Sequence, residues 1–222
     1  GIKMSTIAVI PARGGSKGVK NKNIINLMGK PLIHYILETC ENTKEIDKVV
    51  VSTDSNAIKS TVLEKYPKTI IIDRPEELSG DDATSEVVLL HAIECLSASI
   101  KNTDRIVFLQ ATSPLTTSND LSKLIGLLDK YDSATFYVDD CSNFFDIDEM
   151  RTARVPRQKK TPRKKEAGNA WVFYKEEFLK RKTRLHGNVG LLKILHPCDL
   201  EIDDYVDLMI VESVIKSSYN YD

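Results

Sequence analysis

Ile7-Ala-Val-Ile-Pro-Ala-Arg-Gly-Gly-Ser-Lys-Gly-Val-Lys-Asn-Lys-Asn-Ile24 joins an apolar segment directly to a loop rich in glycine and basic residues. The apolar part, residues 6–10, is continuous and rich in β-branched side chains, which is typical of a strand buried on both faces of a parallel sheet. Glycines let backbone N–H groups approach an anion, and the neighbouring cations neutralise it. The stretch therefore predicts an α/β protein with a polyphosphate site after its first strand.

Two familiar phosphate loops are excluded by the residues themselves. The dinucleotide fingerprint needs a glycine where Ser16 stands, and a P-loop needs Ser or Thr where Pro31 follows Gly29-Lys30. A basic surface loop closed by glycines is the alternative. Its place directly after the first strand favours a ligand site, because α/β sheets bind ligands at the carboxyl ends of their strands.

Composition describes an ordinary globular protein. The 222 residues are 41% hydrophobic and 28% charged, with a net charge of −1, so we expect a single domain over residues 1–222. No global charge favours a nucleic acid or a membrane partner, and no apolar run approaches the roughly 20 residues that span a bilayer. The four cysteines form no C-x-x-C pair, which favours a reduced protein of the cytoplasm. Cys40 and Cys95 fall in apolar helical patterns, and we expect both to be buried.

Strand and helix patterns alternate along most of the chain. This order predicts a three-layer α/β fold, with a mostly parallel, Rossmann-like sheet covered by helices on both faces. We expect strands at 6–10, 48–52, 69–73, 105–109, 134–138, 170–174 and 189–195, and helices at 31–41, 55–66, 84–97, 121–130 and 204–216.

A basic segment interrupts the alternation. Eight of the fifteen residues 151–165 are Arg or Lys and none is acidic; without those eight charges the net charge of −1 would become −9. A solvated loop and a nucleic-acid patch are both open interpretations, although the lack of interleaved aromatic residues disfavours stacking on bases. A third is an arm that reaches a polyanionic substrate, in the same subunit or in another.

Polar residues stand where several predicted strands end, which is where such a sheet places its chemistry. The clusters are Ser52-Thr53-Asp54, Asp73-Arg74-Pro75 and Gln110-Ala-Thr-Ser-Pro114. Most of these residue types also make turns and caps. Gln110 is explained least by turn chemistry, and its amide can donate and accept together.

Asp199-Leu-Glu-Ile-Asp-Asp204 contains the candidate metal ligands. Glu201 and Asp203 alternate along an extended segment, so their carboxylates face one side. Two carboxylates with substrate phosphates and water commonly hold Mg²⁺. The alternative is a capping run, in which Asp203 or Asp204 caps the last helix.

These motifs resemble the acylneuraminate cytidylyltransferases (CMP-sialic acid synthetases). The resemblance rests on Ala12-Arg-Gly-Gly-Ser-Lys-Gly18 with Lys22-Asn23, on Val51-Ser-Thr-Asp54, on Gln110-Ala-Thr-Ser-Pro114 and on Glu201-Ile-Asp203, and it extends from Thr6 to about Ile215. It implies a nucleotidyltransferase that joins CMP from CTP to the anomeric hydroxyl of a nine-carbon 2-keto sugar acid and releases pyrophosphate.

The resemblance also implies roles by position. The nucleotide would be held by Ala12, Arg13, Gly14, Ser16, Lys22, Asn23, Arg74 and Ser85, and the sugar acid by Gln110, Thr112, Ser113 and Arg157. Asp203 and Glu201 would hold Mg²⁺, and the catalytic set would be Lys22, Arg13, Asp203 and Gln110. The family is dimeric, so residues 139–169 would form a basic excursion for dimerisation, and Arg157 would serve the neighbouring active site.

Three departures from the family pattern concern the metal and the sugar. Glu201 stands where Asp is usual, Gly168-Asn169 reverses the usual Asn-Gly, and no Lys or Arg follows the fifth strand in 139–145. We therefore expect a relative of N-acetylneuraminate as acceptor, such as a legionaminic, pseudaminic or deaminated sialic acid. The alternatives are a cytidylyltransferase for another sugar acid, such as an eight-carbon one, and a catalytically inactive nucleotide-binding homologue.

Overall fold

The computed structural model describes residues 4–144 and 154–217, and a sheet of seven strands runs through this part of the chain. The strands are β1 (Thr6–Pro11), β4 (Lys48–Thr53), β5 (Ile70–Asp73), β6 (Arg105–Leu109), β7 (Ser133–Asp140), β8 (Arg163–Tyr174) and β9 (Val189–Lys193), in the order β5-β4-β1-β6-β8-β7-β9. Only β8 of these runs antiparallel to its neighbours. The prediction of a mostly parallel sheet is confirmed.

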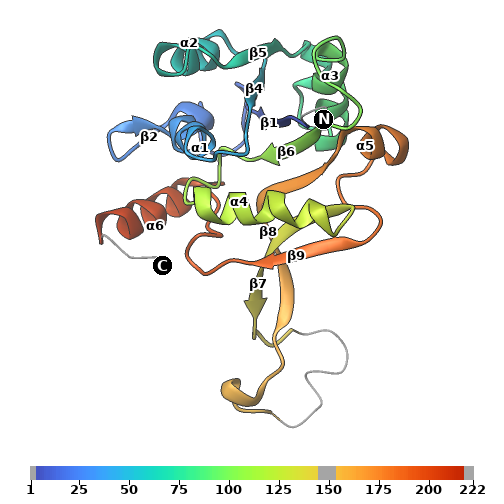
Figure 1. Cartoon of the computed structure of the whole chain (residues 1–222). Coiled ribbons are helices and arrows are strands. Elements are labelled where there is room, and N and C mark those ends of the chain that lie inside the picture. The colour runs from blue at the N-terminus through green and yellow to red at the C-terminus, as the bar shows by residue number, and fades with distance from the viewer. Residues whose placement is uncertain (1–3, 145–153, 218–222) are drawn as a thin grey trace.

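Helices cover both faces of the sheet (Figure 1). They are α1 (Leu32–Glu41), α2 (Asn56–Lys65), α3 (Ser85–Cys95), α4 (Ser118–Gly126), α5 (Lys175–Arg181) and α6 (Tyr205–Lys216). One apolar cluster takes residues from α1, α2 and α4, and a second takes residues from α3 and α5. The three-layer prediction is confirmed.

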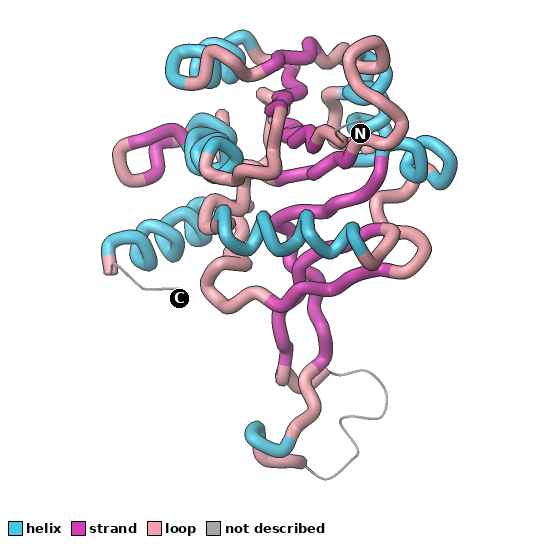
Figure 2. Tube along the Cα trace, in the orientation of Figure 1, coloured by secondary structure: helices cyan, strands magenta, loops and turns pink. Residues whose placement is uncertain are grey.

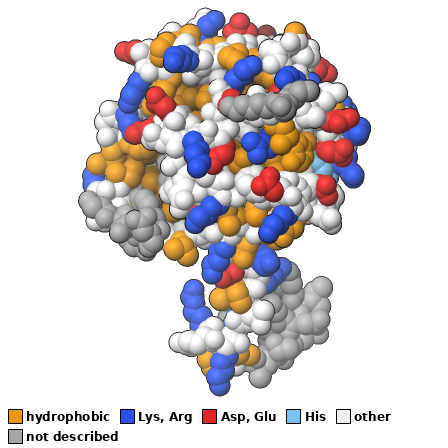
Figure 3. Space-filling model, viewed as in Figure 1, with side chains coloured by type: hydrophobic (Ala, Val, Ile, Leu, Met, Phe, Trp, Pro, Cys, Tyr) orange, Lys and Arg blue, Asp and Glu red, His pale blue; other side chains and the backbone are white. Residues whose placement is uncertain are grey.

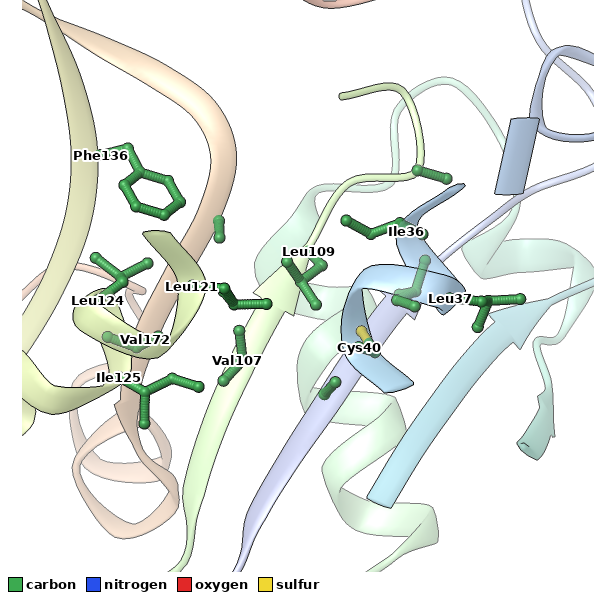
Figure 4. Packing of buried hydrophobic residues seen from close by; sticks show 14 of the residues in the cluster. Ile36, Leu37, Cys40, Val107, Leu109, Leu121, Leu124, Ile125, Phe136 and Val172 are labelled. Carbon is green, nitrogen blue, oxygen red and sulfur yellow. The ribbon is translucent and has the colours of Figure 1, made fainter. Parts of the chain in front are cut away.

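Alternation along β6 explains the two clusters. Val107 and Leu109 belong to the first cluster, whereas Ile106 and Phe108 belong to the second. Successive side chains of a strand point to opposite faces, so an uninterrupted apolar strand feeds both cores. Figure 4 shows side chains of α1 and α4 meeting β6 on the first face. These buried strands hold their carboxyl ends in fixed positions.

Shorter elements fill the connections. They are the hairpin of β2 (Asn26–Leu27) with β3 (Lys30–Pro31) and the 3-10 turns η1 (Lys22–Ile24), η2 (Glu76–Leu78), η3 (Leu127–Asp129) and η4 (Arg157–Lys159). The helix expected at 121–130 starts three residues earlier, because the Thr117 side chain caps it by accepting from Asp120 N.

β7 and β8 continue beyond the sheet as a two-stranded arm, which Figures 1 and 2 show projecting from the main body. The register shifts between Thr135, opposite Trp171, and Phe136, opposite Ala167, so residues 168–170 form a bulge. A bulge bends and twists a strand. Residues 145–153, which include the start of the basic segment, lie outside the described residues.

Cys40 and Cys95 differ in their surroundings. Cys40 is buried in the first core, where desolvation raises the pKa of its thiol to about 12. Cys95 is exposed at the end of α3, so the prediction that it is buried is wrong. All four cysteines are free thiols. Within residues 4–144 and 154–217, no helix combines the length and the hydropathy that a membrane crossing requires.

Candidate active site

A cavity of about 260 Å³ opens at the carboxyl ends of β1, β5 and β6. Eight of the residues singled out from the sequence line it: Arg13, Ser16, Lys22, Asn23, Arg74, Ser85, Gln110 and Thr112. Pro11, Lys17, Ala83, Val88 and Ala111 complete the lining. Side chains spread over a hundred residues of sequence thus meet at one edge of the sheet, as the strand-end argument requires.

The glycine-rich loop is held by hydrogen bonds of its backbone, and Ser16 Oγ also donates to the Val19 carbonyl at 2.5 Å. Ala12, which is buried, donates its N–H to the Ser52 carbonyl at 2.9 Å, and the Gly14 N–H donates to Asp54 Oδ1 at 2.8 Å. A Cβ added at Gly14 would lie 2.9 Å from the Cβ of Ser55. Only glycine therefore fits this close approach.

Arg74 is a buried cation in the wall of the cavity. Its Nε donates to Ser52 Oγ at 3.2 Å and its Nη2 donates to the Ser52 carbonyl at 2.9 Å. Burial lowers the pKa of Arg74, while the Asp54 carboxylate opposes that shift. The guanidinium is thus fixed against the end of β4 and offers its remaining donors to the cavity.

Two cations of the glycine-rich loop share one carboxylate that the sequence analysis did not identify. Arg13 Nη1 lies 2.7 Å from Asp81 Oδ1, and Lys17 Nζ lies 3.3 Å from Asp81 Oδ2. Asp81 stands in an exposed turn before α3, 68 positions away from Arg13. No local pattern indicates a contact over that separation.

The polar residues after β6 face the bulge of β8. Gln110 Nε2 donates to the Gly168 carbonyl at 2.8 Å, and Ser113 Oγ donates to the same oxygen at 3.4 Å. Ser113 is fully buried and does not line the cavity, unlike Thr112. Asn169 points into the interior, where its amide donates to Thr116 Oγ1 and to the Cys198 carbonyl, each at 2.9 Å. The reversed Gly168-Asn169 pair therefore presents glycine to this end of the site.

The acidic pair lies beside the cavity with both carboxylates on one side of the chain. Ile202 between them is fully buried, and Glu201 accepts from Thr112 Oγ1 at 3.3 Å. Asp203 Oδ1 lies 3.7 Å from Lys22 Nζ, and its side chain is 67% exposed. Burial, followed by the charge of Asp203, raises the pKa of Glu201. The alternation expected for this pair is present.

Capping of α6 uses neither carboxylate of the pair, although the Asp203 N–H donates to Asp207 Oδ2 at 2.9 Å. Asp204 caps α6, accepting from Asp207 N at 2.8 Å, and the Asp207 carboxylate accepts from the Asp204 N–H in return. The carboxylates of Asp203 and Glu201, which contact Lys22 and Thr112, are therefore not committed to the helix cap. Among the described residues, no group of three or more His, Cys, Asp or Glu side chains is placed to hold a metal. A bound metal would need further oxygens from substrate and water, as is usual for Mg²⁺.

Arg157 does not join the cavity of its own chain. It lies in η4 on the arm, and its side chain makes no hydrogen bond or ion pair with the described residues. Nearby cations are attached to the arm itself: Lys160 donates to the Ser142 carbonyl at 2.8 Å, and Lys164 lies 5.0 Å from the ring centre of Tyr137. Figure 3 shows Lys and Arg side chains along the arm and where it leaves the body.

A mostly parallel sheet with a cationic cavity beside a glycine-rich loop at its strand ends is typical of Rossmann-like nucleotide-binding proteins. Residues 7–186 match the family model described as cytidylyltransferase, and the chain belongs to this family of nucleotidyltransferases.

Curated relatives of the chain include cytidylyltransferases that are named for their sugar acids. The chain is 42% identical over 112 residues to pseudaminic acid cytidylyltransferase of Campylobacter jejuni serotype O:2, covering 50% of this chain and 48% of that protein. It is 29% identical over 231 residues to N-acylneuraminate cytidylyltransferase of Escherichia coli O18:K1:H7, covering 96% and 52%. The chain spans about half the length of these curated relatives.

A solved structure has the same fold. CMP:2-keto-3-deoxy-manno-octonic acid synthetase, complexed with CTP, superposes with a TM-score of 0.71 over 97% of this chain and 100% of that one. The two sequences are 16% identical.

Proposed function

We propose that the protein transfers CMP from CTP to the anomeric hydroxyl of a nine-carbon 2-keto sugar acid and releases pyrophosphate. The convergence of eight separately identified residues on one cavity carries this proposal. In the reaction, the hydroxyl oxygen attacks the α-phosphorus and loses its proton. The bond from that phosphorus to the bridging oxygen breaks, and pyrophosphate leaves with that oxygen.

Different residues of the site would bind the triphosphate, the nucleoside and the sugar acid. Arg13, Ser16 and Lys22, which line the cavity, would bind the triphosphate, because cations and the N–H groups of a glycine loop stabilise the charge that develops on transfer. Asn23, Arg74 and Ser85 would hold cytidine and its ribose. Gln110 and Thr112 would position the sugar acid so that the reacting atoms meet in line, and the buried Ser113 would support them through the Gly168 carbonyl.

Magnesium is the proposed cofactor. Glu201 and Asp203 suit it, because two oxygen-bearing side chains face one way and neither is used by the cap of α6. When bound there, Mg²⁺ would offset phosphate charge. Lys22 would supply further positive charge to the phosphates. Its Nζ lies 3.7 Å from Asp203 Oδ1, between the proposed metal ligands and the glycine-rich loop.

A sugar related to N-acetylneuraminate, of the pseudaminic or legionaminic kind, is the proposed acceptor. Gly168 in place of a side chain and the turn of Asn169 into the interior leave this end of the site without the usual amide. Identity to two pseudaminic acid enzymes, 42% and 39% over about half the chain, points the same way.

The deciding assay measures pyrophosphate release from CTP and Mg²⁺ with a panel of nine-carbon keto acids, an eight-carbon acid and a no-sugar control. Release with one nine-carbon acid other than N-acetylneuraminate is the expected result. A clear preference for N-acetylneuraminate contradicts the sugar assignment. CTP binding without release for any acid favours an inactive homologue, and the absence of CTP binding contradicts the whole proposal.

We further propose a homodimer of the cytoplasm in which the β7–β8 arm brings Arg157 to the partner's site. Mixing two inactive variants, Lys22→Ala and Arg157→Ala, tests this directly. A mixed dimer contains one intact site, so activity should return toward half of the wild-type value per such dimer. If the mixture stays as inactive as the two separate variants, or if light scattering shows a monomer, the arrangement is contradicted.

A further inference from the structure

Asp81 engages both cations at the edge of the glycine-rich loop. One carboxylate oxygen contacts Arg13 at 2.7 Å and the other contacts Lys17 at 3.3 Å. Both of these cations line the cavity, whereas Asp81 does not. The carboxylate therefore occupies the outer side of groups that face the proposed triphosphate position.

The turn that carries Asp81 can release its carboxylate to water at low cost. The Asp81 side chain is 45% exposed, and the turn is closed by a bond from Ala83 N to the Gly80 carbonyl at 3.3 Å. Its contacts with the glycine-rich loop are surface ion pairs, which are weak and easily exchanged. A polyphosphate that reached Arg13 and Lys17 would meet a negative charge beside it, and like charges at such distances repel.

We propose that Asp81 is an internal counter-anion that pairs with Arg13 and Lys17 until a polyphosphate displaces it, and that it thereby lowers the affinity of the site for CTP and pyrophosphate. This inference rests on the proposed function, because it assigns the triphosphate to these cations. Hydrogen bonds from Arg13 and Lys17 lower the pKa of Asp81, so its carboxylate stays charged at neutral pH. When pyrophosphate leaves, Asp81 returns to the cations and hinders rebinding.

Calorimetric binding of inorganic tripolyphosphate and of CTP tests the inference with three variants. Asp81→Asn should bind both about three- to tenfold more tightly than the wild type, as expected for the loss of two exposed ion pairs. Asp81→Glu keeps the charge and should stay within about twofold of the wild type. Asp82→Asn is the matched control, because Asp82 lies in the same turn and makes no ion pair with the described residues. It should also stay within about twofold.

Salt and product inhibition give further readouts. The advantage of Asp81→Asn should shrink as NaCl is raised toward 1 M, because screening weakens the competing pairs. Its KM for CTP and its inhibition constant for pyrophosphate should both fall, while kcat does not rise. Weaker or unchanged tripolyphosphate binding by a folded Asp81→Asn, or no binding by any variant, overturns the inference.

The two proposals fail in different ways. If CTP does not bind but tripolyphosphate binds more tightly to Asp81→Asn, the cytidylyl transfer is wrong and the counter-anion stands. If the wild type transfers CMP but Asp81→Asn binds no more tightly, only the counter-anion is wrong.

Discussion

The side-chain amide of Asn169 donates to the carbonyl oxygen of Cys198 at 2.9 Å and so joins the bulge of β8 to the segment that leads to the acidic pair. A second bond, to Thr116 Oγ1 at 2.9 Å, joins the same amide to the loop after β6. Three parts of the chain, the bulge of β8, the loop after β6 and the segment before the acidic pair, are therefore joined by one fully buried residue.

Asn169→Ala should destabilise the protein by about 2–4 kcal/mol, because it leaves a buried carbonyl and a buried hydroxyl without their donor. Urea unfolding followed by circular dichroism measures the change. Asn188→Ala is the control: this exposed residue should cost less than about 0.5 kcal/mol. Equal costs would show that the buried bonds contribute nothing.

Lys22→Ala should lower the transfer rate about 10²-fold or more, because it removes a cation from the position where charge develops. Lys22 is only 17% exposed and lines the cavity. Lys164→Ala, on the arm, should matter far less. Steady-state kinetics with saturating CTP distinguish the two, and similar losses would mean that the triphosphate lies elsewhere.

The ion pair of Glu86 with Arg184 should make the stability of the fold depend measurably on pH. Arg184 Nε lies 2.7 Å from Glu86 Oε1, and this contact lowers the pKa of Glu86 from 4.5. A carboxyl whose pKa is lowered by folding adds stability at pH values above its pKa in the unfolded chain. That stability is lost as the pH falls through its pKa in the folded protein. Glu86→Gln should therefore cost about 1 kcal/mol at pH 7 and nothing well below pH 4.5. Thermal melts across this range measure the difference, and a constant difference contradicts the assignment.

Glu201→Gln should abolish most transfer while leaving the fold as stable as before or more so. Burial and Asp203 raise the pKa of Glu201 above 4.5, so the charged form opposes folding as the pH rises past that value. The melting temperature of the variant should exceed that of the wild type at pH 7 and equal it near pH 4. A lower melting temperature at pH 7 would show that Glu201 serves the fold instead.

The parts of the site that follow from local sequence could be predicted. The glycine-rich loop and Gln110 each follow an apolar strand directly, and parallel strands bring their carboxyl ends to one edge. Arg74 could be predicted by the same rule, because it directly follows β5. The common orientation of Glu201 and Asp203 could be predicted from the alternation of side chains along an extended segment, in which the buried Ile202 points inward.

Features that depend on distant contacts could not be predicted. Asp81 stands in a polar turn that looks like any other until the fold places it against Arg13. The sequence predicts β8 only at residues 170–174, because the charged residues 163–166 are typical of a loop. They form a strand because β7 lies alongside, with Asp139 opposite Lys164 and Asp140 opposite Arg163. Oppositely charged cross-strand pairs favour such pairing.

β8 runs without interruption from Arg163 on the arm to Tyr174 in the core. The carbonyl that binds Gln110 belongs to Gly168, in the middle of this strand. A displacement of the arm along the strand axis would therefore reach Gln110, which lines the cavity, through the continuous backbone of β8 and a single hydrogen bond.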